Sequence, residues 1–533
     1  MNKFFLSILI IGVLLRFYNI AWGAPFYFHP DERQNIAYPI QDSKSPLMRD
    51  QKNFDINPFP LIVIKGTYQL ISKLPLHQEP VELTILISRL YSALFSILIS
   101  IILYFIGKKF WNRKVGFIAF TLSVFSTGLI QYSHFGTIEM WEGLILLLLF
   151  YISADLYKSK KIFLYFLLGV TFGLGISIKF LILAISPIII VPFIPLLIST
   201  LRKRNKNNII TLLRSLYLFL IGFVTTILVF FPQLFLNFHQ IEDSLKFEST
   251  VATGKLPVFF TQGFINTYPL LYQIEKVLPF LLNPFILIFS LYAVFYLTYK
   301  SIKKREVYTF LLLLSFLIPF ISTSFLFVKW TRYMIPVLPF LYIINAIFLY
   351  EQLQKIKNVR RRNFVLFLPV IVSIIFSLSF FVTVYLYPHT TVAASTWFDN
   401  KFKNAKSAIS ESFDIGITPF NPVIKEINLI DFYSIESNDN EYENLQEKLQ
   451  ATEFVILPSQ RVLKSRLLNP STFPRGFAFY NLLLNNRNSF KLIYKTPCNV
   501  ICKIAYVGDP IYSNEETVTV FDRPSVFIFK KIK

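Results

Sequence analysis

The chain has 533 residues, a formal net charge of +22, 54% apolar residues and only 16% charged residues, and its mean hydropathy is +0.52. A soluble domain carries about a quarter charged residues, so this composition excludes a soluble enzyme of this length and also a disordered chain. Two cysteines exclude a disulfide scaffold and a cysteine-based zinc ribbon. The composition therefore indicates a polytopic α-helical membrane protein.

Eleven apolar stretches predict membrane-spanning helices, because a bilayer core takes about 20 mostly apolar residues. The stretch 162–199 is nearly twice that length and contains one charge, Lys179, so we expect two helices that meet there. The first stretch also fits a cleaved signal peptide, but Arg16 interrupts it and the sequence stays apolar as far as Trp22, which favours an uncleaved helix. The predicted spans are 3–21, 84–106, 115–131, 140–156, 162–178, 180–199, 212–231, 276–298, 308–328, 333–350 and 364–387.

Basic residues gather in the loops on one side of these spans. That side has 21 Lys or Arg in 50 loop residues, whereas the opposite side has 10 in 117. Positively charged loops stay in the cytoplasm, so we expect a cytoplasmic N-terminus and, with eleven helices, an extracytoplasmic C-terminal region. The net charge thus marks topology, and no nucleic-acid partner is expected. The basic loops are 107–114, 157–161, 200–214, 299–307 and 351–363.

Two outer loops and the C-terminal region are long enough to carry structure of their own. Loops 22–82 and 232–275 are rich in aromatic residues and should pack against the outer membrane surface, with 58–74 as an interfacial helix. From residue 389 onward, charges recur every few residues and the long apolar runs end. We therefore divide the chain into a transmembrane catalytic domain, 1–388, and an extracytoplasmic α/β domain, 389–533.

Short β-type runs and one helical stretch support the α/β assignment of the outer domain. The cysteines, Cys498 and Cys502, fit no metal motif, and we expect them to be buried or paired without a catalytic role. The turn signal Asp522-Arg523-Pro524 predicts a connection between the last two strands. The predicted strands are 453–457, 490–495, 499–506, 517–521 and 525–530, and the predicted helix is 441–450.

Two groups of carboxylates lie at the predicted outer face. Asp31 and Glu32 directly follow Pro30, which fixes the backbone beside membrane-hugging aromatic sequence. In such a half-dry cleft a carboxylate can act as a base, although plain solvated loop charges are the simpler reading. A second acidic motif comprises His134 and Glu139, and here the simpler reading is a favourable interaction with the helix dipole.

Four cations lie at the same predicted outer level, namely Arg89, Lys179, Lys329 and Arg332. A cation at the edge of the bilayer is costly and usually has a partner. A lipid phosphate is a natural counter-ion, and arginine binds phosphate with two parallel N–H groups. Snorkelling to the headgroups is the alternative for each one separately. The chain has no Walker A loop, no His-Glu-x-x-His and no Asp-x-Asp, so a soluble nucleotide donor on the cytoplasmic side is not supported.

The sequence resembles the GT-C membrane glycosyltransferases, in particular the protein-mannosyltransferase and aminoarabinose-transferase-like branch, which uses phospholipid-carried sugars. The transmembrane part carries the resemblance in Leu15-Arg16-Phe17-Tyr18-Asn19, His29-Pro30-Asp31-Glu32, Ser88-Arg89-Leu90-Tyr91-Ser92, Gly173-Leu174-Gly175-Ile176-Ser177-Ile178-Lys179-Phe180 and Arg332-Tyr333-Met334-Ile335-Pro336-Val337-Leu338-Pro339. The outer domain carries it in Ala393-Ala394-Ser395-Thr396-Trp397, Pro458-Ser459-Gln460-Arg461 and Thr519-Val520-Phe521-Asp522-Arg523-Pro524.

The resemblance implies transfer of a sugar from a polyprenyl-phosphate donor to a protein, lipid or glycan acceptor on the outer face of the cell membrane. Asp31 matches the family's acidic catalytic residue of the first outer loop, and Glu139 stands where relatives often carry aspartate. No cofactor is certain, and the need for a divalent metal ion stays open. The alternative function is a flippase for lipid-linked sugars, whose signature would be an internal repeat and broken helices at the midplane. An adhesion protein would not need eleven helices.

Overall fold

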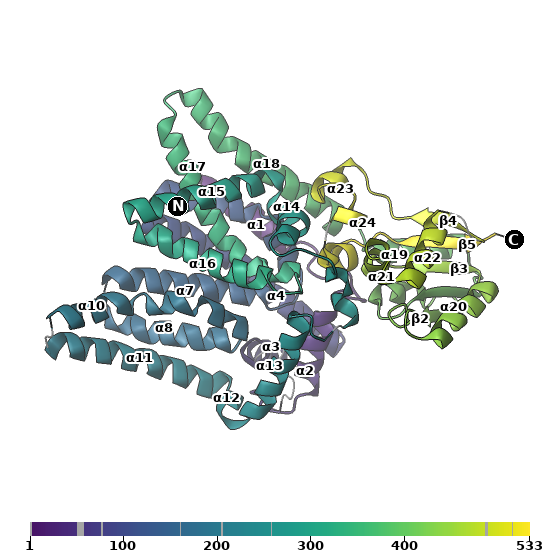
Figure 1. Ribbon diagram of the computed structural model, residues 1–533, viewed down its shortest axis with the longest axis horizontal. Helices are drawn as coiled ribbons and strands as arrows, with labels where there is room; N and C mark the ends of the chain where they lie inside the picture. The colour runs from purple at the N-terminus through teal and green to yellow at the C-terminus, as the bar shows by residue number, and fades with distance from the viewer. Residues whose placement is uncertain are drawn as a thin grey trace.

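The computed structural model describes residues 3–50, 58–75, 78–159, 161–203, 206–256, 258–485, 489–513 and 515–532. A bundle of long apolar helices forms one part, and a smaller part with a five-stranded sheet lies at one end of it (Figure 1). The N-terminus and α10 (Phe193–Lys203) lie at the end of the bundle that faces away from the sheet. Parts of the outer loop 22–82, at 51–57 and 76–77, lie outside the described residues.

Within the described ranges, seven helices are long and apolar enough to cross a membrane, or up to eight if one bent pair forms a single span. The bent pair is α5 and α6, which meet at 56°. The predicted multi-pass helical fold is thus confirmed, whereas the count of eleven is not. The long helices are α4 (Pro80–Phe110), α7 (Glu139–Ser159), α11 (Lys206–Phe230), α15 (Pro284–Lys304), α16 (Val307–Ser324), α17 (Leu338–Lys355) and α18 (Val359–Tyr385), and the bent pair is α5 (Arg113–Val124) with α6 (Thr127–Ser133).

The three other predicted spans are shorter or broken. α1 (Lys3–Phe17) and α8 (Ile162–Ile176) have 15 residues each. The prediction of one helix over 180–199 is wrong, because this stretch is a 3₁₀ helix, Phe180–Ile185, followed by α9 (Ser186–Ile190) and α10 (Phe193–Lys203). Pro192 separates the last two helices, since it has no N–H to donate to the helix. The predicted turn at Lys179 is confirmed, because α8 ends at Ile176.

Small residues and one buried cation hold the bundle together. α8 and α11 cross so closely that a Cβ on Gly169 would lie 2.0 Å from the carbonyl oxygen of Phe219, which is the kind of contact that glycine permits between membrane helices. Arg16 of α1 is fully buried and donates hydrogen bonds to Ser96 Oγ and to the carbonyl of Ser123. α1 is therefore packed into the bundle.

The outer loops contain short helices. α2 (Tyr38–Asp42) and α3 (Pro58–Ile71) follow α1. The predicted helix near 58–74 is therefore present, and its Lys65 is buried and donates to the carbonyl of Ser43 over 2.6 Å. The second loop contains α12 (Gln233–Leu236), α13 (Phe238–Ala252), a 3₁₀ helix (Phe259–Phe264), a π-helix (Gln273–Val277) and α14 (Leu278–Leu282).

The C-terminal part is a sheet with helices on both faces, in the strand order β2-β1-β3-β5-β4. β1 is parallel to β2 and β3, whereas β5 is antiparallel to β3 and β4. Alternate residues point to opposite faces, so Ile409 and Val455 pack with α20 to α22, while Ala408 and Phe454 pack with α19. The elements are α19 (Thr390–Lys401), β1 (Ser407–Glu411), β2 (Glu426–Ile430), α20 (Asp439–Ala451), β3 (Phe454–Leu457), α21 (Arg461–Leu468), α22 (Pro474–Leu484), β4 (Phe490–Lys495), α23 (Val500–Ala505), α24 (Pro510–Ser513) and β5 (Phe527–Lys531).

Three of the five predicted strands and the predicted helix exist, and two predicted strands are wrong. The run 499–506 is α23, and the run 517–521 is a π-helix, Thr517–Asp522. Cys498 and Cys502 form a disulfide at the start of α23, one turn apart, a spacing that suits a helix and not a strand. The turn 522–524 thus connects a helix to β5, and β1 and β2 were missed because no long apolar run marks them.

Candidate active site

Asp31 lies in the loop that follows α1, beside the bundle and the C-terminal part. It directly precedes the π-helix Glu32–Ala37. Its Oδ2 accepts a hydrogen bond from Nη1 of Arg332 over 2.7 Å, and 24% of the Asp31 side chain and 29% of the Arg332 side chain remain exposed. The structure thus brings together two of the predicted site residues and leaves both open to a ligand.

The carboxylate of Asp31 is held in its charged form. Burial by itself would raise its pKa, but the positive charge of Arg332, with smaller contributions from Lys179 and Arg461, brings the pKa of Asp31 below its usual value. Asp31 is therefore ionised and able to accept a hydrogen bond or a proton. Its basicity is restrained as long as Arg332 stays paired with it.

Arg332 keeps part of its hydrogen-bonding capacity unused. Its Nε is buried and has no hydrogen-bond partner among the described residues. Its guanidinium lies over the Trp330 ring, 4.2 Å from the ring centre, and this contact fixes its plane. An arginine with a fixed plane and a free N–H suits an oxyanion such as a phosphate.

Lys179 completes the exposed charged group. It has 22% of its side chain exposed, and its Nζ lies 3.7 Å from Glu142 Oε2 and 5.2 Å from the centre of the Tyr333 ring. The interaction with Glu142 is too long for a hydrogen bond, so the ammonium keeps donors for a ligand. Asp31, Lys179 and Arg332 therefore form a small open cluster of charged groups, with the buried Glu142 beside Lys179.

Arg89 and Glu32 behave differently from this cluster, because they form a buried ion pair. The Arg89 Nε and Nη2 groups donate to the two carboxylate oxygens of Glu32 over 2.7 and 2.8 Å, and the exposed fractions of the two side chains are 1% and 0%. Nη1 of Arg89 donates to the carbonyls of Ile20 and Trp22, and Glu32 also accepts from the Gly136 N–H. These contacts argue for a structural role and against contact with a donor phosphate.

Lys329 is also buried inside the protein. Its Nζ donates to Thr267 Oγ1 over 3.0 Å and to the carbonyl of Phe327 over 2.9 Å. Only 3% of the residue is exposed. It therefore connects the second outer loop to the turn before α17. Because Lys329 is buried and already bonded, unlike Lys179 and Arg332, its environment argues against phosphate binding.

The two residues of the second acidic motif, His134 and Glu139, also differ in their environments. Both ring nitrogens of His134 face backbone carbonyl oxygens, those of Ile130 and Tyr18, at 2.9 and 3.0 Å, and the ring stacks on Tyr385. His134 is therefore a packed structural residue. Glu139 begins α7 and is buried, but its Oε2 has no hydrogen-bond partner within the described ranges. Its charge acts on Lys179 and Arg332, so Glu139 lies beside the open cluster.

The C-terminal part supplies residues that sequence reasoning did not assign to the site. Glu515 Oε2 accepts a hydrogen bond from Thr331 Oγ1 over 2.5 Å, next to Arg332. The Phe521 ring lies 4.6 Å from that of His29, two residues before Asp31. Only the family-like sequence around Arg461 and Phe521 could have pointed to this contact, because composition does not predict contacts between distant segments.

The described residues contain no group of three or more His, Cys, Asp or Glu side chains that could hold a metal ion. Asp31 and Glu32 cannot share one, because Glu32 is fully engaged by Arg89 and the Gly136 N–H. Asp31 and Glu32 therefore do not form a paired carboxylate site for a divalent ion.

Residues 83–228 match the family model of dolichyl-phosphate-mannose-protein mannosyltransferases. The matched segment includes Arg89, His134, Glu139 and Lys179. The match confirms the expected resemblance to this branch and with it the predicted class of protein, a membrane glycosyltransferase. A comparison with curated proteins gave no match.

The solved structures that are similar to the chain include the following three. The oligosaccharyltransferase of Archaeoglobus fulgidus with a tethered acceptor peptide is 12% identical, with 100% of this chain and 89% of that chain covered and a TM-score of 0.49. ArnT from Cupriavidus metallidurans in the apo state is 12% identical, with 88% and 94% covered and a TM-score of 0.46. The same protein bound to undecaprenyl phosphate is 12% identical, with 99% and 97% covered and a TM-score of 0.45.

Proposed function

We propose that this membrane glycosyltransferase transfers a sugar from a polyprenyl-phosphate donor to an acceptor hydroxyl on the outer side of the cell membrane. The observation that carries the proposal is the open cluster of Asp31, Lys179 and Arg332. The family match is to enzymes named for a dolichyl-phosphate-mannose donor, which has the same lipid-phosphate chemistry.

The two cations hold the phosphate that leaves. The donor phosphate oxygens accept hydrogen bonds from Arg332 and Lys179, whose positive charge stabilises the negative charge that grows on the leaving oxygen. When Arg332 turns toward the phosphate, its hold on Asp31 weakens and the basicity of that carboxylate rises. Donor binding and activation of the base are thereby coupled.

Asp31 then serves as the base. The acceptor oxygen attacks the anomeric carbon while the bond from that carbon to the phosphate oxygen breaks, and the electron pair leaves with the phosphate. Asp31 takes the proton of the acceptor hydroxyl. Attack from the face opposite the phosphate inverts the anomeric configuration.

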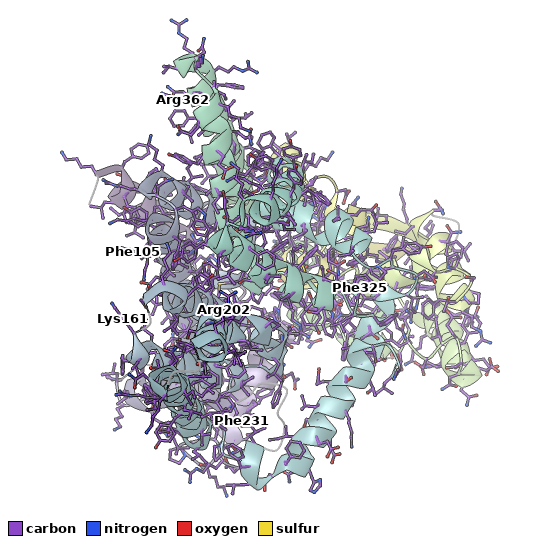
Figure 2. All side chains as sticks on the ribbon, turned by 60° about the vertical axis from the view of Figure 1, so that its left-hand side comes forward. Phe105, Lys161, Arg202, Phe231, Phe325 and Arg362 are labelled. Atoms are coloured by element: carbon purple, nitrogen blue, oxygen red, sulfur yellow. A yellow bond between two sulfur atoms is a disulfide. The ribbon has the colours of Figure 1, made fainter. Side chains whose placement is uncertain are left out.

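The orientation in the membrane belongs to the same proposal. The basic loops are expected in the cytoplasm, and the labelled Lys161 and Arg202 lie away from the sheet in Figure 2. The disulfide Cys498–Cys502 suits an oxidising compartment. Both observations support a cytoplasmic N-terminus and an extracytoplasmic domain from about residue 389.

The direct test is transfer of label. Membranes that contain the protein are incubated with radiolabelled polyprenyl-phosphate sugars, and the labelled product is identified. We expect a labelled product that is no longer attached to the lipid carrier from wild-type membranes and none from membranes with Asp31→Asn. Equal labelling by both would contradict the proposal, and movement of intact donor across the bilayer without a labelled product would favour the flippase.

A further inference from the structure

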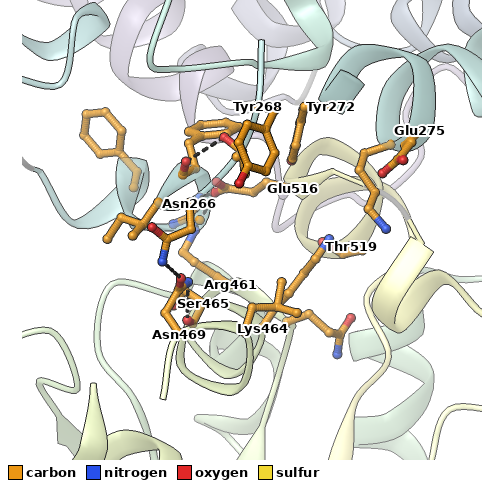
Figure 3. A pocket seen from close by; sticks show the side chains of 18 of the residues that line it. Asn266, Tyr268, Tyr272, Glu275, Arg461, Lys464, Ser465, Asn469, Glu516 and Thr519 are labelled. Carbon is orange, nitrogen blue, oxygen red and sulfur yellow. Dashed lines mark hydrogen bonds and ion pairs between the residues drawn. The ribbon is translucent and has the colours of Figure 1, made fainter. Parts of the chain in front are cut away.

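A cleft of about 270 Å³ lies between the second outer loop and the C-terminal part. In Figure 3, Tyr268, Tyr272 and Glu275 of the outer loop lie on one side of it, and Lys464 and Asn469 lie on the other. The two sides are joined by a hydrogen bond of 2.9 Å from Asn266 to Asn469. None of the residues predicted from the sequence as site residues lines this cleft.

The sheet places its ligand-binding edge at this cleft. β1 lies between β2 and β3, so the chain leaves β1 toward one neighbour and later returns to the other. In open α/β sheets, ligands bind at the carboxyl ends of the strands where the strand order reverses in this way. The carboxyl end of β3 leads into Gln460 and Arg461, which line the cleft, and Phe413, just past β1, stacks on Phe259 of its wall.

The lining combines aromatic faces with hydrogen-bonding groups. The Tyr268 side is open, with 72% of that residue exposed, and Tyr272 contacts Phe264 edge to face. Thr519 and Glu275 add a hydroxyl and a carboxylate group, and Asn469 adds an amide that is bonded to Asn266 and to the carbonyl of Ser465. An aromatic face offers an apolar surface to C–H groups, while these polar groups both donate and accept hydrogen bonds.

The strongest cation of the cleft is paired within the protein. Arg461 gives its Nε and Nη2 to Glu516 over 2.6 and 2.5 Å and its Nη1 to the carbonyl of Phe413. Two further cations, Lys276 and Lys464, and one further carboxylate, Glu275, also line the cleft. A sugar ring, with apolar faces and a hydroxyl rim, matches the aromatic and polar groups of this lining.

The cleft adjoins the open cluster. The rings of Phe260 and Phe264 in its wall lie 6.1 and 6.0 Å from Trp330, whose ring also contacts the Arg332 guanidinium. The charge of Arg461 in its lining lowers the pKa of Asp31. A group bound in the cleft is therefore a neighbour of the reacting groups.

We propose that this cleft binds a sugar unit of the acceptor, so that the acceptor is a glycan or a glycosylated molecule. The inference rests on the proposed function, because it names the acceptor of that reaction. The cleft is slightly smaller than the 300 to 1,000 Å³ usual for small-molecule sites, which suits one sugar ring with the rest of the glycan outside. A ring stacked on Tyr268 and Tyr272 would present its neighbour to the donor.

Binding can be measured without turnover. The full-length protein in lipid nanodiscs is examined by saturation-transfer NMR with the methyl glycosides of mannose, glucose, galactose and N-acetylglucosamine. We expect at least one glycoside to receive saturation through its ring C–H protons. The double variant Tyr268→Ala/Tyr272→Ala should bind it about tenfold more weakly, since each aromatic contact contributes about 0.5–1.5 kcal/mol.

One further variant blocks the cleft, and another is a control outside it. Gly263→Trp places a large ring in the cleft, and a Cβ there meets no atom within 4 Å, so it should block binding without disturbing the fold. Tyr387→Ala is the matched control, because Tyr387 is a similarly exposed tyrosine, 62%, that lies outside the cleft. It should bind the glycoside as the wild type does.

The proposal is overturned if no glycoside gives a saturation-transfer signal, or if the cleft variants leave that signal unchanged. Cleft-dependent binding of inorganic phosphate or of a serine-containing peptide, without glycoside binding, would overturn it as well. The Asp31→Asn protein separates this proposal from the previous one. It should bind the glycoside normally. If the wild-type enzyme transfers sugar but binds no glycoside, the proposal for the cleft is wrong and the proposed reaction stands. If the wild-type enzyme binds the glycoside but transfers no sugar, the proposed reaction is wrong and the proposal for the cleft stands.

Discussion

Arg332 donates a hydrogen bond to Asp31 across 301 positions of sequence, over 2.7 Å. Asp31 follows α1 and Arg332 precedes α17, so the pair connects the start of the helical bundle to one of its last helices. The pair is partly exposed, in contrast to Arg89 and Glu32, which are closed off from solvent. A ligand can reach the first pair and not the second.

Asp31→Asn should reduce turnover about 100-fold or more, because the amide keeps the size of the side chain and loses its basicity. Initial rates with a saturating polyprenyl-phosphate sugar measure the effect. Expression and thermal unfolding should stay near wild type, since the side chain is partly exposed. A turnover close to wild type would remove Asp31 from the role of base.

Arg332→Ala and Lys179→Ala should weaken donor use, each by about 1.5–3 kcal/mol, because each removes a charged hydrogen bond to the phosphate. Apparent donor affinity of the purified variants measures this. Lys300→Ala is a suitable control, because Lys300 pairs with Glu306 and Glu351 in a different part of the bundle. Donor affinity that equals wild type in both test variants would mean that the two cations only interact with headgroups.

Arg89→Ala should damage the fold and not donor binding. Removal of one partner leaves the Glu32 carboxylate buried and uncompensated, at a cost of about 3–5 kcal/mol. Thermal unfolding in detergent should show a clear loss of stability for Arg89→Ala and for Glu32→Gln. Arg33→Ala is the control, because Arg33 makes an exposed hydrogen bond to the carbonyl of Pro25. If the Arg89→Ala protein is stable but uses the donor less well, Arg89 binds the donor phosphate after all.

The sequence predicted the class of fold and the pair Asp31 and Arg332 as members of one outer site. It could not rank the cations, because Arg89 and Arg332 look alike in a hydropathy plot. The difference lies in their partners: Glu32 and two carbonyls surround Arg89, whereas Arg332 keeps a free Nε. Those partners come from segments far apart in sequence, and only the packed structure defines them.

The errors in the C-terminal part have a local cause. The runs 499–506 and 517–521 are rich in β-branched and aromatic residues, which favour strands, yet they fold as helices against the bundle. Tyr506, for example, stacks on Phe280 and packs near Phe380 of α18. Burial against another part of the protein thus overrides intrinsic preference, and the sequence alone does not show that neighbour.

A single engineered cysteine tests the orientation. Both native cysteines are in the disulfide, so Asn440→Cys, in the exposed first turn of α20, supplies a single free thiol. We expect an impermeant maleimide to label it in intact cells. Lys357→Cys in a basic loop should react only after permeabilisation. The reverse pattern would invert the proposed topology.

Stability of the C-terminal part should depend on pH through Glu411. Burial, and then the nearby charge of Asp414, raises the pKa of Glu411 to about 8. The folded state therefore holds a proton that the unfolded chain releases near the ordinary value, so stability should fall as pH rises from about 4.5 to about 8, by up to about 1.4 kcal/mol per pH unit, and then level off. Thermal unfolding of the full chain at a series of pH values measures this.

Glu411→Gln should flatten that profile, whereas Glu426→Gln on the exposed strand β2 should leave it unchanged. A smaller slope should remain, because burial also raises the pKa of Asp522 to about 8. Identical slopes for Glu411→Gln and the wild type would show that Glu411 does not control the effect.

The hydrogen bond from Thr331 to Glu515 has a consequence for how such enzymes diverge. It joins the turn that carries Arg332 to a segment near the C-terminal end, so the C-terminal part helps to form the wall of the proposed site. A chimera in which a foreign domain replaced residues 389–533 would lose the contact between Thr331 and Glu515, and its domain would not fit the turn that carries Arg332. New acceptor preferences would then have to arise by paired substitutions in the outer domain and the loop before α17, and not by shuffling of a detachable module.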